Sequence, residues 1–217
     1  MKNERLGASV LSVKVISNVA PSMAEALGLG PDHRSLGLIT STCDDVTYVA
    51  LDEATKAAAV DVVYAKSFYG GADNATTKLA GEVIGILAGP SPAEVKSGLA
   101  VAVQEIETGA SFYSANEDDS IPYFAHCVSR TGTHLSKEAG ISEGSALAYL
   151  IAPPLEAMYG LDAALKAADV EVAAFYGPPS ETNFGGGLLS GSQSACKAAC
   201  DAFAEAVAMV AENPTTY

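Results

Sequence analysis

The chain contains two copies of one sequence. Residues 51–62, LDEATKAAAVDV, return as residues 161–172, LDAALKAADVEV, at a fixed offset of 110 positions. Eight of the twelve positions are identical, and the pair Asp61/Glu171 keeps its negative charge. Two units of about 100 residues nearly fill the chain, and this is a common size for a domain. The sequence therefore predicts two domains, over residues 1–110 and 111–217.

The pattern of expected strands and helices also repeats. In the first half we expect strands over 10–19, 35–40, 46–51, 61–69 and 81–89, with helices over 23–29, over 52–60 and from Ser91 to near Gly109. In the second half we expect strands over 124–130, 145–152, 170–176 and 186–191, with helices over 133–140, after Pro153-Pro154 and over 194–213. Residues 42–45 are expected to form a polar turn, and 110–121 a polar connection. The fold class is therefore α/β (α+β), as a tandem repeat.

Charge and hydropathy exclude several classes of partner. The formal net charge is −14 at pH 7, which disfavours binding to nucleic acid or to an anionic membrane surface. No run approaches the ~20 apolar residues that a membrane-spanning helix needs. The first residues, MKNERLGAS, contain no apolar segment typical of a signal peptide. We therefore expect a cytosolic protein.

Motifs for catalysis and metal binding are missing from the sequence. It contains no Walker motif, no dinucleotide-binding GxGxxG after a strand and no HExxH. The four cysteines form no CxxC pair, so we expect buried thiols, and we expect neither a metal site nor a resident cofactor. No nucleophile, base and orienting group can be assembled at sensible spacing. We therefore expect that the protein is not an enzyme.

Carboxylates and one aromatic ring are the candidate ligand-binding residues. Asp44 and Asp45 are adjacent, and like charges this close are unfavourable unless they are solvated or bind a cation. Glu82 opens an otherwise apolar expected strand, and Phe112 lies in a polar connection. Carboxylates and a ring suit an ammonium ligand. A solvated surface turn remains the alternative for Asp44 and Asp45.

Several long runs resemble one known family. The L-type shell proteins of the ethanolamine-utilisation bacterial microcompartment are similar to this chain over nearly its whole length. The resemblance is carried by HRSLGLI (33–39), DDVTYVALDEATK (44–56), VVYAKSFY (62–69), GEV (81–83), SRTGTHLS (129–136), APPLEAMYGLDAALKAADV (152–170), PPSETN (178–183) and GSQSACKAAC (191–200).

The resemblance implies an architecture and an assembly. Each chain would carry two circularly permuted microcompartment-shell domains, and three chains would form a six-domain disc, a pseudohexamer. Such discs would contact other shell proteins laterally and form the shell of a microcompartment in the cytoplasm. A trimeric regulatory protein that senses a small molecule, without shell assembly, remains the alternative function.

The resemblance also implies two kinds of pore. Small pores within each subunit would bind ethanolamine, at Asp45, Glu82 and Phe112 with Asp44 beside them. A gated central pore would be controlled by residues of two loops, with Gly185, Gly186 and Gly187 allowing large backbone changes. The candidate gate residues are Tyr69, Gly70, Gly71, Thr182, Asn183 and Phe184. Whether the pore entrance also binds cobalamin is left open by the sequence.

Overall fold

The chain forms two compact units. A computed structural model describes residues 4–67, 77, 79–180 and 183–215. The first unit comprises Gly7–Ala110 together with the short segment Gly132–Leu135. The second unit comprises Ser111–Thr131, Ser136 onward and the described residues before Gly7. Compared with the predicted ranges 1–110 and 111–217, each unit thus includes a short segment from the other range.

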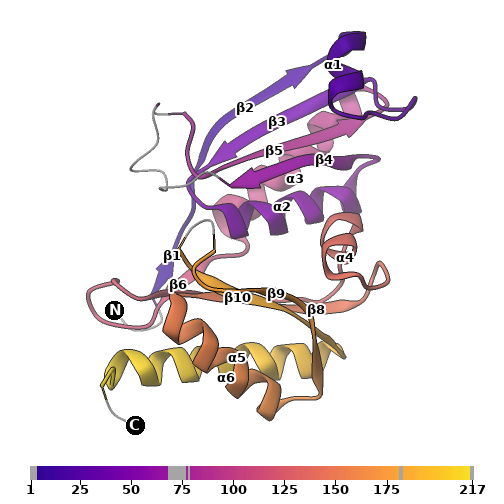
Figure 1. The fold of residues 1–217 in the computed structure, drawn as a ribbon. Coiled ribbons are helices and arrows are strands. Elements are labelled where there is room, and N and C mark those ends of the chain that lie inside the picture. Colours follow the sequence, from indigo (N-terminus) through magenta and orange to yellow (C-terminus); the bar gives the residue numbers. More distant parts are fainter. Residues whose placement is uncertain (1–3, 68–76, 78, 181–182, 216–217) are drawn as a thin grey trace. The chain divides into compact units, whose positions relative to one another are not determined.

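The first unit is built on a four-stranded antiparallel sheet with the strand order β2-β3-β5-β4 (Figure 1). The strands are β2 (Val10–Ile16), β3 (Ser35–Ser41), β4 (Asp61–Ser67) and β5 (Val83–Gly89). Its helices are α1 (Pro21–Ala26), α2 (Asp44–Ala57) and α3 (Pro92–Thr108). Helices α2 and α3 pack on each other and on the sheet. Leu51 and Val95 are fully buried, so the core lies between these helices and the strands.

The second unit has a six-stranded antiparallel sheet with the order β1-β6-β7-β8-β10-β9. Its strands are β1 (Arg5–Leu6), β6 (Phe112–Ser114), β7 (Pro122–Val128), β8 (Ala146–Ala152), β9 (Val170–Tyr176) and β10 (Gly185–Gly191). Its helices are α5 (Pro154–Ala167) and α6 (Gln193–Glu212), preceded by α4 (Thr133–Ala139), whose first residues are counted with the first unit. Leu150, Leu161 and Phe203 belong to its core.

The structural elements repeat in the same order as the sequence. The strand order β2-β3-β5-β4 of the first unit recurs as β7-β8-β10-β9 in the second. Helices α2 and α5 each follow the second strand of their copy and are both 14 residues long. The predicted mixed α/β class and its tandem repeat are therefore confirmed. None of the helices in the described part of the chain is both long and apolar enough to cross a membrane.

The prediction of a turn over 42–45 and a strand over 46–51 is wrong, because α2 begins at Asp44. Val46, Ala50 and Ala54 are buried at the four-residue spacing of one helical face. Carboxylates in the first turn of a helix are stabilised by its dipole. Asp44 and Asp45 occupy this turn. These features outweigh the preference of the β-branched residues for a strand.

Two further expectations about loops also change. The supposed connection 110–121 contains strand β6, which pairs with β1 and β7. The three glycines from Gly185, expected to allow large backbone changes, pair with β8 as part of β10, and Gly186 and Gly187, within the expected strand 186–191, also pair with β9. Gly186 has φ +152°, and a Cβ there would lie 1.9 Å from the carbonyl oxygen of Leu150. Glycine is therefore needed at Gly186 because the strands approach closely.

Asp52 lies within α2 and is fully buried. Its Oδ2 accepts the N–H of Gly132 at 2.7 Å, and its Oδ1 accepts the N–H of Leu135 at 2.8 Å. Thr55 Oγ1, one turn further along α2, accepts the N–H of Thr133 at 3.1 Å. The first N–H groups of a helix have no partner within that helix. The Gly132–Leu135 segment, at the start of α4, therefore finds its acceptors on α2.

We expect Asp52→Ala to lower the free energy of unfolding by about 2–5 kcal/mol, because each buried N–H left without an acceptor costs roughly 1–3 kcal/mol. Chemical denaturation followed by circular dichroism measures this change. Asp201→Ala is the matched control, since Asp201 pairs with Lys197 in an exposed position on α6. We expect it to change the free energy of unfolding by less than about 0.5 kcal/mol. Equal effects of the two substitutions would contradict the structural role of Asp52.

Candidate functional site

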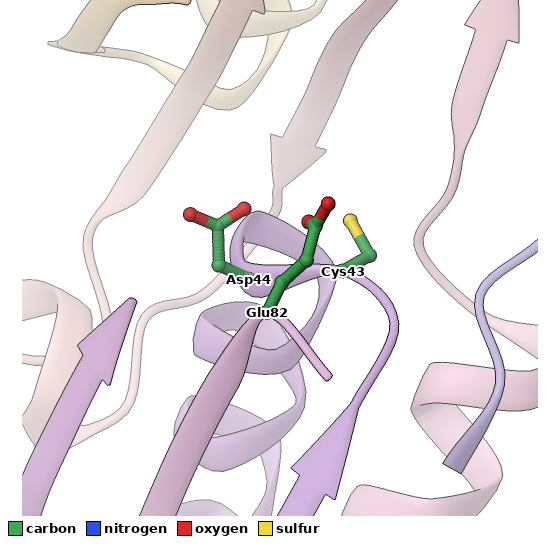
Figure 2. A group of neighbouring side chains, drawn as sticks. All are labelled: Cys43, Asp44 and Glu82. Carbon is green, nitrogen blue, oxygen red and sulfur yellow. The ribbon is translucent and has the colours of Figure 1, made fainter. Parts of the chain in front are cut away.

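Three polar side chains meet at the start of α2. The ligand atoms of Cys43, Asp44 and Glu82 all lie within 4.8 Å of one another. Figure 2 shows the three side chains extending to the same side of the chain, from the start of the helix and from the residue before β5. Asp45 follows in the same turn, and both aspartates are buried, with 7% of each residue exposed. The structure thus brings together two of the predicted residues, Asp44 and Glu82, and adds Cys43.

Ser41, the last residue of β3, is hydrogen-bonded to the backbone of both segments that form this cluster. Its Oγ accepts the N–H of Cys43 at 3.1 Å and lies 2.6 Å from Thr47 Oγ1. Thr47 Oγ1 in turn donates to the carbonyl oxygen of Cys43 at 2.8 Å. On the other side, the N–H of Glu82 donates to the carbonyl oxygen of Ser41 at 2.9 Å. One buried serine therefore fixes the backbone at Cys43 and at Glu82.

Gly81 allows the approach of Glu82 to Ser41. Its φ is +64°, in the left-handed region that side chains disfavour. A Cβ at this position would lie 2.0 Å from the carbonyl oxygen of Ser41. The glycine is therefore required locally, and it sets the point at which Glu82 joins the cluster.

The carboxylate of Asp44 is oriented by hydrogen bonds. Its Oδ1 accepts the N–H of Asp45 at 2.9 Å, and its Oδ2 accepts the hydroxyl of Ser67 at 2.7 Å. Ser67 is the last residue of β4, and its Oγ lies 2.5 Å from the hydroxyl of Tyr48. The alternative of a solvated surface turn is therefore wrong for Asp44, since this carboxylate is buried and fixed from two elements.

The electrostatics of the cluster favour a bound cation. Burial raises the pKa of the Cys43 thiol well above its usual value, and the charges of Asp45 and Asp44 raise it further. A hydrogen bond with the Val46 backbone lowers this pKa, and the charge of Glu82 adds the smallest increase. Cys43 therefore stays neutral near pH 7, and a protonated thiol is a poor nucleophile. An ammonium group would be attracted by the carboxylates. A divalent metal ion of the zinc type would also find sulfur and oxygen ligands here once the thiol loses its proton.

Phe112 lies in the second unit and packs within it. Its ring centroid is 5.2 Å from that of Phe124 and 6.1 Å from that of Phe184, and the residue is only 9% exposed. The structure therefore brings this predicted ligand-binding residue to Phe184, a predicted gate residue. Asn183, beside it, has φ +68°, and its N–H donates to the carbonyl oxygen of Ser180. The other predicted gate residues, Tyr69, Gly70, Gly71 and Thr182, lie outside the described residues.

The cluster is a property of the first copy alone. At the start of α5, Pro154 and Leu155 occupy the positions of Asp44 and Asp45 at the offset of 110. Leu155 is 61% exposed, whereas Asp45 is buried. The first turn of α5 keeps one carboxylate, Glu156, but it lacks the aspartate pair with which α2 begins. Cys43 was missed by sequence reasoning because it belongs to no metal-binding motif, and its place directly before the aspartate pair was the only signal.

Comparison with known proteins identifies the family. A family model described as the BMC domain matches residues 35–117. Over all 217 residues, and the whole of both chains, the sequence is 73% identical to the bacterial microcompartment shell protein EutL of Clostridium perfringens (strain 13 / Type A). The chain belongs to the EutL family of bacterial microcompartment shell proteins. It is therefore a structural protein of the microcompartment shell, as its resemblance to that family implied.

Further members of the EutL family agree in sequence and in fold. EutL of Escherichia coli (strain K12) is 54% identical over 206 residues, which cover 95% of this chain and 94% of that protein. The crystal structure of the ethanolamine utilization protein EutL from Leptotrichia buccalis C-1013-b matches with a TM-score of 0.99 and 74% identity, and covers 100% of both chains. The repeat seen in this chain is therefore part of a fold that the EutL family shares.

We expect the alkylation rate of Cys43 to keep rising with pH through about 9, without a plateau. Only the thiolate reacts, and the raised pKa means that few Cys43 thiols are deprotonated in this pH range. Asp45→Asn removes one negative charge from the cluster, lowers the pKa of Cys43 and speeds the reaction at each pH. Peptide mapping by mass spectrometry after iodoacetamide treatment follows Cys43 separately from the other thiols. A plateau near the ordinary value of about 8.5 would contradict this electrostatic picture.

Proposed function

We propose that the protein is a tile of the microcompartment shell, made of three copies of the chain. Three chains with two copies of one fold each would give a disc of six similar domains. Closed cyclic symmetry is the usual arrangement of such homo-oligomers. Fusion of two copies makes neighbouring domains differ, which allows one copy to carry a site that the other lacks. The lateral edges of the disc would then contact other shell proteins.

We propose further that the acidic cluster of the first copy binds ethanolamine in a small pore of the subunit. The observation that carries this proposal is the meeting of Asp44 and Glu82 beside Asp45 at the start of α2. Ethanolamine carries one ammonium and one hydroxyl group, and both can donate hydrogen bonds to carboxylates. A cation placed here also relieves the repulsion between like charges. Phe112 is assigned to ethanolamine binding by the family resemblance alone, as a ring face for the ammonium group.

The central pore of the disc would be the route for larger molecules. By family resemblance, its gate would consist of Tyr69, Gly70 and Gly71 in the first copy and residues 182–184 in the second. Of these residues the structure describes Asn183, which has a left-handed backbone conformation, and Phe184, which packs on Phe112. Ethanolamine bound in the small pore would favour one of two arrangements of the gate, as a population shift.

We expect Asp45→Asn and Glu82→Gln each to weaken ethanolamine binding by about tenfold or more, because a hydrogen bond to a charged partner contributes roughly 1.5–3 kcal/mol. Titration calorimetry with the purified protein measures this loss. Asp201→Asn removes the same charge from an exposed position on α6 and should leave the affinity unchanged. Unchanged binding in both cluster variants would refute the site.

Lateral assembly decides between a shell tile and the alternative, a trimeric sensor of small molecules. We expect the concentrated protein to form flat sheets of edge-to-edge discs in electron micrographs. A sensor would instead remain a discrete trimer and bind its metabolite tightly. Discrete trimers at every concentration, combined with tight metabolite binding, would favour the sensor.

A further inference from the structure

Helix α5 exposes an apolar surface that its repeat partner α2 does not. Ala157, Leu161 and Ala164 on the inner side are buried in the core. The outer face of α5, as we name it, consists of apolar residues one turn apart that are all well exposed. Its members are Leu155, Met158, Tyr159 and Leu165, which are 61%, 47%, 50% and 37% exposed.

The equivalent positions on α2 are covered. At the offset of 110 they are Asp45, Tyr48, Val49 and Thr55. Asp45 and Val49 are buried, and Tyr48 and Thr55 are half-buried. The Gly132–Leu135 segment, which belongs to the first unit, contacts two of these positions, Tyr48 and Thr55.

Direct contacts hold the Gly132–Leu135 segment on α2. Besides the bonds to Asp52 and Thr55, the ring of His134 lies 6.2 Å from that of Tyr48, centroid to centroid. Leu135 is only 2% exposed. The outer face of α2 is thus closed by this segment, and an equivalent cover would close the outer face of α5.

The covering segment has its own repeat partner, Ala20–Met23. Strands β2 and β7 correspond at an offset of 112, which places Ala20 opposite Gly132 and Met23 opposite Leu135. Gly28 and Gly140 follow the two short helices at the same offset, both with φ +63°. Among the described residues of α1 none is buried, and Met23 is 44% exposed. Both the segment and the outer face of α5 are therefore exposed in the single chain.

Changes between the copies are matched on the two surfaces. In the first pair, the N–H of Thr133 donates to Thr55 Oγ1. In the second pair, Pro21 stands in place of Thr133 and Leu165 in place of Thr55. Proline has no N–H to donate, and leucine has no acceptor to offer. Both members of the polar pair have thus been replaced by apolar residues.

The buried aspartate, in contrast, is kept. Asp162 corresponds to Asp52, and it pairs with Lys166 as Asp52 pairs with Lys56. Since Asp52 accepts the N–H of Gly132 despite its lysine, the exposed Asp162 can accept the N–H of Ala20 in the same way. The aspartate is thus the same in both copies. The Thr55–Thr133 pair, in contrast, differs at both of its positions between the copies.

We propose that Ala20–Met23 of a second copy of the chain docks on the outer face of α5. Each copy offers one such segment and one such face, so the contact is head-to-tail and repeats until a ring closes. Met23 takes the buried place of Leu135, and Ser22 lies against Met158 as His134 lies against Tyr48. This inference rests on the proposed assembly of several copies, and it names the surfaces that hold them together.

Cross-linking between mixed chains tests the contact directly. One chain carries Ser22→Cys, the other carries Met158→Cys, and the two are refolded together and treated with a short bismaleimide. Mass spectrometry of the digest should find a peptide that joins positions 22 and 158 in the mixture. The unmodified chain reveals the background from native cysteines. A mixture with Val172→Cys in place of Met158→Cys is the matched control, since Val172 is 51% exposed on β9.

Charge insertion tests the same contact from both sides. Met23→Asp and Met158→Asp should each shift the protein from its assembled mass to that of one chain in light scattering, while the circular dichroism spectrum stays unchanged. Val172→Asp should leave the assembled mass unchanged. If a charged variant loses its fold, the cross-link still decides.

The outcomes separate this inference from the proposed trimer. A cross-link between positions 22 and 158 supports the interface, whatever the assembled mass. If that mass differs from three chains, the trimer proposal fails although the interface stands. A three-chain mass without the cross-link, and unaffected by both charged variants, overturns the interface and leaves the trimer standing. An unmodified chain that stays monomeric at every concentration overturns both.

Discussion

The two hydrogen bonds that buried Asp52 accepts from Gly132 and Leu135 are the interaction on which much of the first unit depends. A sheet covered on one side by two helices buries only the inner face of each helix. The outer face of α2 is closed because a carboxylate on it provides acceptors for the first N–H groups of a following helix. That contact holds a segment far along the sequence on α2. The outer face of α5, in the same fold, has no such covering segment among the described residues of the single chain.

The acidic cluster depends on the same helix. Asp44 and Asp45 gain from the dipole at the start of α2, and hydrogen bonds from Ser67 and the backbone stabilise the charge of Asp44. Ser41 holds Glu82 beside them through its carbonyl group. Negative charge is thereby concentrated at a fixed, buried place with a neutral thiol next to it. Such a place is suited to binding a small cation rather than to nucleophilic chemistry.

Duplication accounts for the fold, and divergence accounts for the site. The two copies share their strand order and the placement of α2 and α5. They differ where Asp45 is replaced by Leu155, which removes a charge from the start of α5 and exposes an apolar side chain in its place. A shell protein built from two such copies gains neighbouring domains with different surfaces. By the two proposals above, one copy would bind a ligand and the other would make a contact between chains.

The sequence predicted those features that depend on local chemistry. Ser91 was expected to begin α3, and its Oγ does accept the N–H of Glu94 at 3.3 Å. The repeat at offset 110 correctly indicated two copies of a mixed fold. Residues 46–51 were wrongly predicted as a strand because Val and Thr favour strands locally, while burial on one helical face, a tertiary effect, decided for α2.

Parts of the candidate site could not be predicted for the same reason. Cys43 joins the cluster only because Ser41 links β3 to the residue before β5, and no spacing along the chain encodes such a contact. Phe112 appeared to be a ring in a polar connection, but strand pairing places it against Phe124 and Phe184. Both residues are positioned by contacts between distant segments.

The scaffold of the chain is duplicated, whereas the proposed ligand site is present once. A high-resolution structure of the assembled protein with ethanolamine distinguishes one site from two. We expect ligand density at the carboxylates of Asp45 and Glu82 in every chain, and none at the start of α5 near Leu155. Equal density at both places, or density only at α5, would contradict it.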